Sequence, residues 1–113
     1  MKLVIAYIRP EKLNDVKQSL FKAEILKISV SNALGCGEEP NYFENYRGAG
    51  AEVDLHKRVR VEAAVNDQFV AKVIDAIIAG AQTGGVGDGK IFVLPIDDCV
   101  RIRTGERGNV AIG

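Results

Sequence analysis

Glycines and one lysine late in the chain carry the clearest chemical signal. Residues 83–90 read T-G-G-V-G-D-G-K, and five glycines fall within the ten residues from Gly80 to Gly89. Consecutive glycines can turn successive backbone N–H groups toward one point, which makes a nest for an anion, and Lys90 adds a full positive charge. The segment therefore predicts a phosphate-binding turn. The structural alternative is a tight helix-to-strand connection that needs glycine for positive φ.

The same segment matches most of G-x-x-x-x-G-K, the phosphate loop of nucleotide hydrolases, but its context is different. Residue 91 is Ile rather than the Ser or Thr that would hold magnesium. Lys90 also leads into an expected strand, whereas that loop leads into the N-terminus of a helix. We therefore do not expect a hydrolase of this class.

Two arginines, Arg101 and Arg103, lie two positions apart in an alternating segment over residues 99–103. On a strand or extended arm they share one side, where paired guanidinium groups can grip phosphates through charge-assisted hydrogen bonds. Together with Lys90 they would neutralise a di- or triphosphate. In the alternative they form ordinary surface ion pairs with nearby carboxylates, namely Asp97, Asp98 or Glu62.

No catalytic constellation accompanies these cations. His56 is the only histidine, and Cys36 and Cys99 form no CxxC, which indicates a reducing cytoplasm and no disulfide framework. His56 and Cys36 with Glu38 and Glu39 match no zinc signature. We therefore expect a binding protein and not an enzyme. A slow ATPase or phosphotransferase, and a metal- or small-anion-responsive adaptor, stay as alternatives.

Composition excludes several classes of partner. The 113 residues include 15 Lys plus Arg and 15 Asp plus Glu, so no global field attracts nucleic acid or an anionic membrane. The apolar run over residues 3–8 is too short for a signal peptide, and no stretch approaches the roughly 18 apolar residues of a membrane span. A single soluble cytoplasmic domain over residues 1–113 is predicted, without nucleic acid or membrane insertion.

The elements that position these groups repeat a β-α-β pattern. Apolar positions superimpose on a shift of 57 residues, which places Val4 on Val61 and Leu20 on Ile77. Periods of two indicate strands and periods near 3.6 indicate helices. The expected order is strand, helix, strand, strand, helix and strand, over residues 3–8, 10–21, 26–31, 58–65, 66–78 and 91–94. Asn66 is expected to cap the second helix, and the glycines from Gly80 onward to end it.

This order predicts an α+β ferredoxin-like sandwich in which two helices cover one face of a four-stranded antiparallel sheet. The other face carries Lys27, Ser29, Arg60 and Glu62 among apolar neighbours, so we expect other subunits to cover it. The C-terminal segment, about 96–113, is expected to form an extra edge strand or an extended arm.

A long segment, about 37–55, separates the halves and lacks a sustained period. From residue 38 to 54 its charged residues are five acids and one base, listed in order as Glu38, Glu39, Glu44, Arg47, Glu52 and Asp54. Loops of this length on rigid scaffolds tend to be functional. It is predicted to be a protruding loop that binds a partner or responds to a ligand, against the alternative of a solvated excursion.

Residues 83–93, with Val100–Glu106, Tyr46–Gly48 and Ile8–Leu13, closely resemble the PII nitrogen-regulatory signalling proteins. The resemblance covers essentially the whole chain without insertion. It implies a ferredoxin-like homotrimer that binds ATP or ADP in the clefts between subunits. It also implies a loop that docks on an ammonium transporter, another transporter or an enzyme of nitrogen assimilation.

The resemblance further implies individual roles. The residues of the phosphate turn are Gly87, Asp88, Gly89 and Lys90. Those of the arm that reaches in from a neighbouring subunit are Arg101 and Arg103. The hinge at the base of the loop is Gly35, Cys36 and Gly37, which also bind the nucleotide that lies beside it. The adenine contacts are Ser29, Glu62 and Ala64. The partner-binding residues of the loop are Glu44, Tyr46 and Arg47, with Arg47 at the position that plugs a transporter pore.

The loop departs from this family at residues 38–41. Relatives that sense 2-oxoglutarate usually carry Arg or Gln and then Gln-Lys-Gly there, whereas this chain has E-E-P-N. Glu38 would face a γ-phosphate and Glu39 an oxoacid carboxylate, and like charges about 4 Å apart repel by roughly 4 kcal/mol at an effective dielectric of 20. Standard 2-oxoglutarate sensing is therefore not expected, although Glu39 is a candidate ligand for magnesium with ATP. Ala49 and Ala51 exclude covalent modification at the positions where relatives carry Ser or Tyr.

Overall fold

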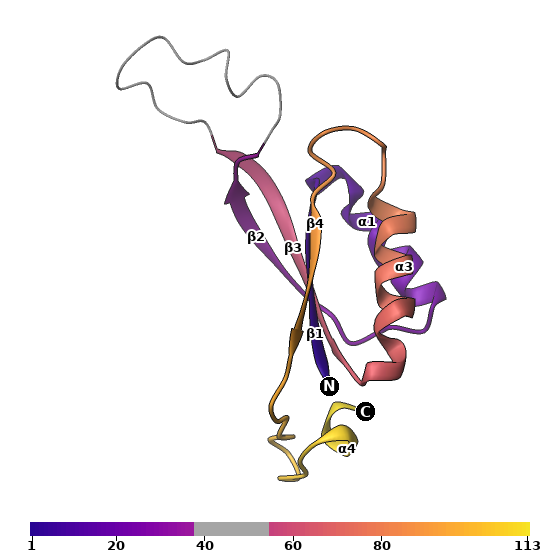
Figure 1. The fold of residues 1–113 in the computed structure, drawn as a ribbon, viewed down its shortest axis with the longest axis vertical. Helices are drawn as coiled ribbons and strands as arrows, with labels where there is room; N and C mark the ends of the chain where they lie inside the picture. The colour runs from indigo at the N-terminus through magenta and orange to yellow at the C-terminus, as the bar shows by residue number, and fades with distance from the viewer. Residues whose placement is uncertain (38–54) are drawn as a thin grey trace.

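The computed structural model describes residues 1–37 and 55–113 (Figure 1). Its four strands form one antiparallel sheet in the order β2-β3-β1-β4. The elements in chain order are β1 (Lys2–Ile8), η1 (Pro10–Lys12), α1 (Leu13–Lys22), β2 (Ser29–Gly35), β3 (His56–Val65), η2 (Asp67–Phe69), α3 (Val70–Ala81), β4 (Lys90–Pro95) and α4 (Asn109–Ile112). The predicted α+β ferredoxin-like fold is confirmed. No helix in the described ranges is long and apolar enough to cross a membrane.

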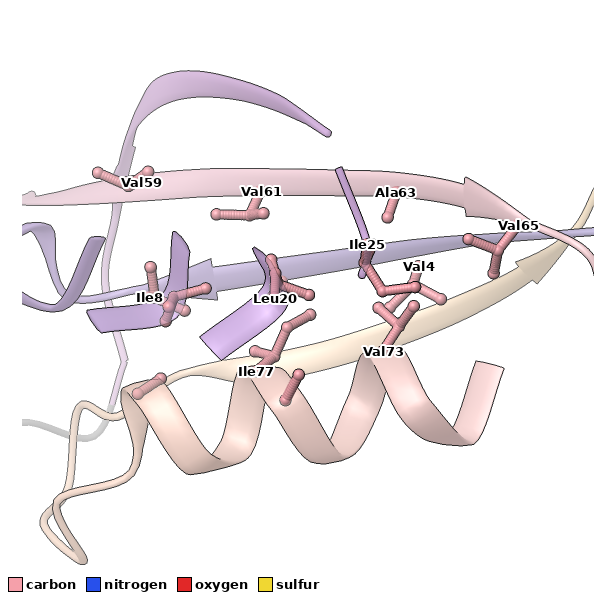
Figure 2. Packing of buried hydrophobic residues seen from close by; sticks show 14 residues of the cluster. Val4, Ile8, Leu20, Ile25, Val59, Val61, Ala63, Val65, Val73 and Ile77 are labelled. Atoms are coloured by element: carbon pink, nitrogen blue, oxygen red, sulfur yellow. The ribbon is translucent and has the colours of Figure 1, made fainter. Parts of the chain in front are cut away.

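Helices α1 and α3 lie together on one side of the sheet and leave its other side uncovered (Figure 1). The core fills the space between the helices and the sheet, and side chains of both halves meet there (Figure 2). Most residue pairs related by the 57-residue shift are buried, namely Val4 with Val61, Ala6 with Ala63, Ile8 with Val65, Val16 with Val73 and Leu20 with Ile77. The pair Leu13 and Val70 is partly buried at the edge of the core, and the pair Phe21 and Ile78 is 44% and 43% exposed. The hydrophobic repeat of the sequence is therefore the core of the fold.

Gly80 brings the two helices into close approach. A Cβ at this position would lie 2.7 Å from Cα and 2.8 Å from the backbone N of Val16 in α1. Gly80 was expected to help end the second helix, which is wrong, because α3 continues to Ala81. Its missing side chain serves helix packing instead.

Strand β2 begins and ends later than expected. The alternation over residues 26–31 predicted a strand there, but Leu26 is 66% exposed and lies in the connection that follows α1. That connection turns at Glu24, where φ is 64°, and places Ile25 in the core. The strand itself extends to Gly35, where it pairs with His56.

The C-terminal segment forms no extra strand, so that part of the prediction is wrong. One isolated bridge joins Val100 to Arg107, and the chain then ends in α4. The N–H groups of Arg101 and Gly105 bond to the carbonyls of Glu106 and Arg101 respectively, which folds the segment back on itself. The segment after Val100 therefore forms a turn and not a strand.

Asn66 occupies the cap position before η2 but its side chain makes no cap hydrogen bond. Its amide instead donates to the carbonyl oxygen of Asn109 at 3.3 Å. Its side chain therefore joins the end of β3 to the C-terminal helix.

Candidate functional site

A cavity of about 650 Å³ opens on the uncovered side of the sheet. The end of β2, the glycine turn and the start of β4 surround it, and Tyr7, Arg58 and Phe92 complete its wall. The predicted site residues among its lining are Gly35, Cys36, Gly37, Gly87, Asp88, Gly89 and Lys90. The structure thus brings the predicted hinge and the predicted phosphate turn to one cavity.

The turn between α3 and β4 needs its glycines for conformation. Gly84, Gly87 and Gly89 have φ values of 89°, 106° and 100°, which side chains disfavour. A Cβ on Gly89 would lie 1.7 Å from the carbonyl oxygen of Tyr7. These conformations bear out the alternative of a tight connection that needs glycine, and the phosphate-binding turn stays a prediction.

Asp88 stabilises this turn through hydrogen bonds to the residues at its start. Its carboxylate accepts hydrogen bonds from the backbone N–H groups of Thr83 and Gly84, both at 2.8 Å, and from the Thr83 hydroxyl. The expected anion nest over residues 84–89 is therefore smaller than the glycine pattern suggested. Within the described part of the chain, no hydrogen bond occupies the amides of Val86, Gly87 and Gly89. These amides and Lys90 are the groups that can meet a phosphate.

The same hydrogen bonds lower the pKa of Asp88. The Thr83 hydroxyl has the largest effect, and the backbone N–H groups of Thr83 and Gly84 and the side chain of Arg9 act in the same direction. They hold the pKa of this carboxyl well below the usual range for aspartate. The pKa of Asp67 is also lowered, mainly by its hydrogen bond from the N-terminal ammonium, and that of Asp98 by Arg107.

Acid is therefore expected to destabilise the fold. A carboxyl whose pKa is lower in the folded than in the unfolded state stabilises the protein above the unfolded value, about 3.9, and this contribution disappears as the pH falls through the folded value. The free energy of unfolding, measured in urea, should be nearly level from pH 7 to 5 and fall below about pH 4. Asp88→Asn should flatten the acid limb. An Asp88→Asn profile parallel to the original would contradict the assignment.

Arg101 is bound within its own arm. Its guanidinium donates to the Glu106 carboxylate at 2.6 Å and to the Val110 carbonyl at 3.0 Å. The expected surface partners are not used, since Asp98 pairs with Arg107 and Glu62 pairs with Arg60.

Arg103 lies exposed in the turn after Arg101. The expectation that the two arginines share one side of a strand is therefore wrong, because residues 101–104 form a turn.

The remaining predicted nucleotide contacts lie away from the cavity. Ser29 is opposite Glu62 in the pairing of β2 with β3, and Ala64 lies two residues further along β3. None of the three lines the cavity, and neither do Arg101 and Arg103. One chain thus carries two separate sets of predicted contacts, one at the cavity and one on the β2–β3 face and the arm.

The predicted loop residues Glu39, Glu44, Tyr46 and Arg47 lie outside the described residues. The proposed metal group also includes Glu38 and Glu39, which are outside as well. Cys36 and His56 lie on either side of the loop, at the ends of β2 and β3. Residues 1–37 and 55–113 contain no group of three or more side chains that could hold a metal ion.

Arg9 and Tyr7 are among the site residues that the sequence pattern did not predict. Arg9 donates to the Val86 carbonyl oxygen at 2.8 Å and approaches the Asp88 carboxylate at 3.3 Å. Tyr7 lines the cavity, and its ring meets that of Phe92 edge-on with centroids 6.3 Å apart. Antiparallel pairing of the first strand with the last could have found them, because it brings the end of β1 to the start of β4.

Comparison with known proteins gives a consistent result. The family model described as "Nitrogen regulatory protein P-II" matches residues 1–106. Nitrogen regulatory protein GlnK1 of Methanosarcina mazei is 46% identical over 114 residues, covering 99% of this chain and 97% of that protein. Nitrogen regulatory protein P-II of Azospirillum brasilense is 46% identical over 112 residues, covering 99% of this chain and all of that protein.

A solved structure has the same fold. Arabidopsis thaliana PII bound to citrate superimposes with a TM-score of 0.78 and is 38% identical, covering 97% of this chain and 87% of that chain. Its likeness and the family match extend over both halves of the sheet and the glycine turn. This chain therefore belongs to the nitrogen regulatory protein P-II family, a family of signal-transduction regulators.

Proposed function

We propose that this regulator binds ATP and ADP competitively in clefts between the subunits of a homotrimer. One observation carries the proposal: the predicted contacts form two sets that lie apart on a single chain. The cavity set lines the cavity, and the β2–β3 set lies on the face of these strands and on the arm. A second copy placed with its β2–β3 face and arm against the cavity would complete one site from both sets. The cavity of about 650 Å³ falls in the range usual for small-molecule sites.

The uncovered side of the sheet supports an assembly of copies. Phe92 and Leu94 are 49% and 42% exposed there, and they follow Lys90 at alternate positions of β4. Apolar side chains gathered on one face are typical of subunit interfaces. Burial of this face at the centre of a trimer would leave the helices outside.

The chemistry of the cavity favours a phosphate ligand. Lys90 and the three amides of the turn offer positive charge and N–H donors to an anion. The Arabidopsis PII in the comparison is bound to citrate, itself a small anion. Magnesium held with ATP by Glu39 stays part of the proposal.

The output of the protein is proposed to be docking and not turnover. In this proposal the chain acts in the cytoplasm as one domain, residues 1–113. Its loop at residues 37–55 contacts an ammonium transporter, another transporter or an enzyme of nitrogen assimilation. Gly35, Cys36 and Gly37 join that loop to the cavity, so a ligand in the cavity would bias the loop directly.

Calorimetric titration with ATP and ADP tests the nucleotide proposal. We expect micromolar binding of both, and a loss of about 10- to 100-fold in Lys90→Gln, because hydrogen bonds to charged groups contribute about 1.5–3 kcal/mol. Lys72→Gln removes the same charge from an exposed site on α3 and should bind like the original. If neither ATP nor ADP binds below millimolar concentration, the nucleotide proposal is wrong.

The affinity for 2-oxoglutarate is measured by the same calorimetric titration. With ATP and magnesium present, 2-oxoglutarate should bind weakly or not at all, because Glu38 and Glu39 place negative charge where it would bind. Micromolar binding that depends on ATP would show that the two acids do not act in this way.

A further inference from the structure

The glycine turn between α3 and β4 needs a contact from outside the turn to hold its conformation. Three glycines at positive φ make the segment costly to order, since glycine loses more conformational freedom than any other residue. Asp88 orders residues 83 and 84, yet it also puts a full negative charge beside the amides that would meet a phosphate. A working phosphate turn needs this segment restrained and that charge offset.

Arg9 meets both needs. It follows the last residue of β1 in extended conformation and precedes Pro10, so its backbone is fixed by the sheet on one side and by η1 on the other. One nitrogen of its guanidinium donates to the Val86 carbonyl oxygen at 2.8 Å, and another lies 3.3 Å from the Asp88 carboxylate. The planar fork of an arginine can make both contacts at once.

The surroundings of this contact strengthen it. The side chains of Arg9 and Asp88 are only 26% and 22% exposed, so solvent screens their attraction incompletely. A Cβ on Gly85 would lie 3.6 Å from the Arg9 guanidinium, so residue 85 is also close to it. The amides of Val86, Gly87 and Gly89 lie in the part of the turn that Arg9 holds.

We propose that Arg9 is a positioning residue for phosphate binding. It holds the turn at Val86 and offsets the charge of Asp88, so that the amides of residues 86–89 and Lys90 face an anion. Arg9 does not itself touch the phosphate in this proposal. The phosphate part rests on the nucleotide proposal above, whereas the restraint of the turn can be tested without any ligand.

The ligand-free test is amide hydrogen exchange followed by NMR. Arg9→Gln should accelerate exchange at Thr83 and Gly84, whose amides bond to Asp88, and leave amides in the middle of α3 unchanged. Lys12→Gln is the matched control, because it removes a positive charge from η1 whose ion-pair partner is Asp15 and not Asp88. Unchanged exchange at Thr83 and Gly84 in Arg9→Gln would overturn the inference, whether or not the protein binds nucleotides.

The ligand test is a double-mutant cycle on ATP affinity. Arg9→Gln should weaken ATP binding about 10-fold and Arg9→Lys less, because lysine keeps the charge but loses the fork. In an Asp88→Asn background the effect of Arg9→Gln should shrink, since the charge to be offset is gone. An equal or larger effect in that background indicates direct phosphate contact and overturns the positioning role, as does unchanged affinity in Arg9→Gln. If the unmodified protein binds no nucleotide, the nucleotide proposal fails and the exchange experiment still decides the role of Arg9 in the turn.

Discussion

Replacing Gly89 by alanine is expected to destabilise the fold by about 3 kcal/mol or more. The new Cβ would lie 1.7 Å from the carbonyl oxygen of Tyr7, at a φ of 100° that alanine disfavours. Because Tyr7 pairs with Lys90 across β1 and β4, relief of this clash must separate the two strands where the turn begins. Binding of any ligand at the turn should be lost as well.

Gly84→Ala is the control that separates the clash from the backbone strain. Gly84 has a similar φ, 89°, but nothing lies within 4 Å of its Cβ position. Strain alone should cost about 1 kcal/mol. Urea denaturation of both variants measures the difference, and equal losses of unfolding free energy would show that the approach to Tyr7 is not limiting.

Mixing two inactive variants is expected to restore nucleotide binding. Lys90→Gln damages the cavity set and Arg103→Gln damages the arm, so each pure assembly should bind poorly. Where each site takes its two sets from neighbouring subunits, every trimer that contains both variants has one intact interface out of three, so about one third of the sites in such trimers should bind with the original affinity. Arg103 is chosen over Arg101 because Arg101 also stabilises the arm through its hydrogen bond to Glu106. A substitution of Arg101 would therefore disturb the structure of the arm as well as nucleotide binding.

The mixture is made by co-expression with two different tags and purification of assemblies that carry both. Calorimetry then gives the number of sites with the original affinity. Lys90→Gln mixed with the double variant Lys90→Gln/Arg103→Gln is the control and should restore none. Failure of the complementary mixture to restore any site would place all contacts on one chain and contradict the shared cleft.

The fold was predictable because two signals agree. The period of two and the period near 3.6 each occur twice, and the 57-residue shift pairs residues such as Val4 and Val61 that both become buried. The strand predictions were wrong where alternating apolar side chains do not pack against the core. Leu26 is 66% exposed and Ile102 is 99% exposed, so neither belongs to a buried strand face. Glycine at positive φ, as at Gly105 and Gly108, bends the arm instead.

The site was only partly predictable. Gly87 and Lys90 could be predicted, because a backbone anion site is built from glycines and a cation that lie close together in sequence. Arg9 did not, since it lies 79 residues before Asp88 and only the pairing of β1 with β4 brings them together. The predictions for Glu39, Glu44, Tyr46 and Arg47 lie outside the described residues and stay predictions.

The close approach of Gly80 to Val16 has a mechanical consequence. Helices whose backbones nearly touch cannot slide past each other without opening the core, so the helical layer acts as a stiff wall behind the sheet. A ligand that enters the cavity therefore finds little compliance on that side. Cys36 and Gly37, by contrast, are exposed and, among the described residues, have no helix packed behind them, so we expect a ligand in the cavity to displace the base of the loop before it displaces the helices.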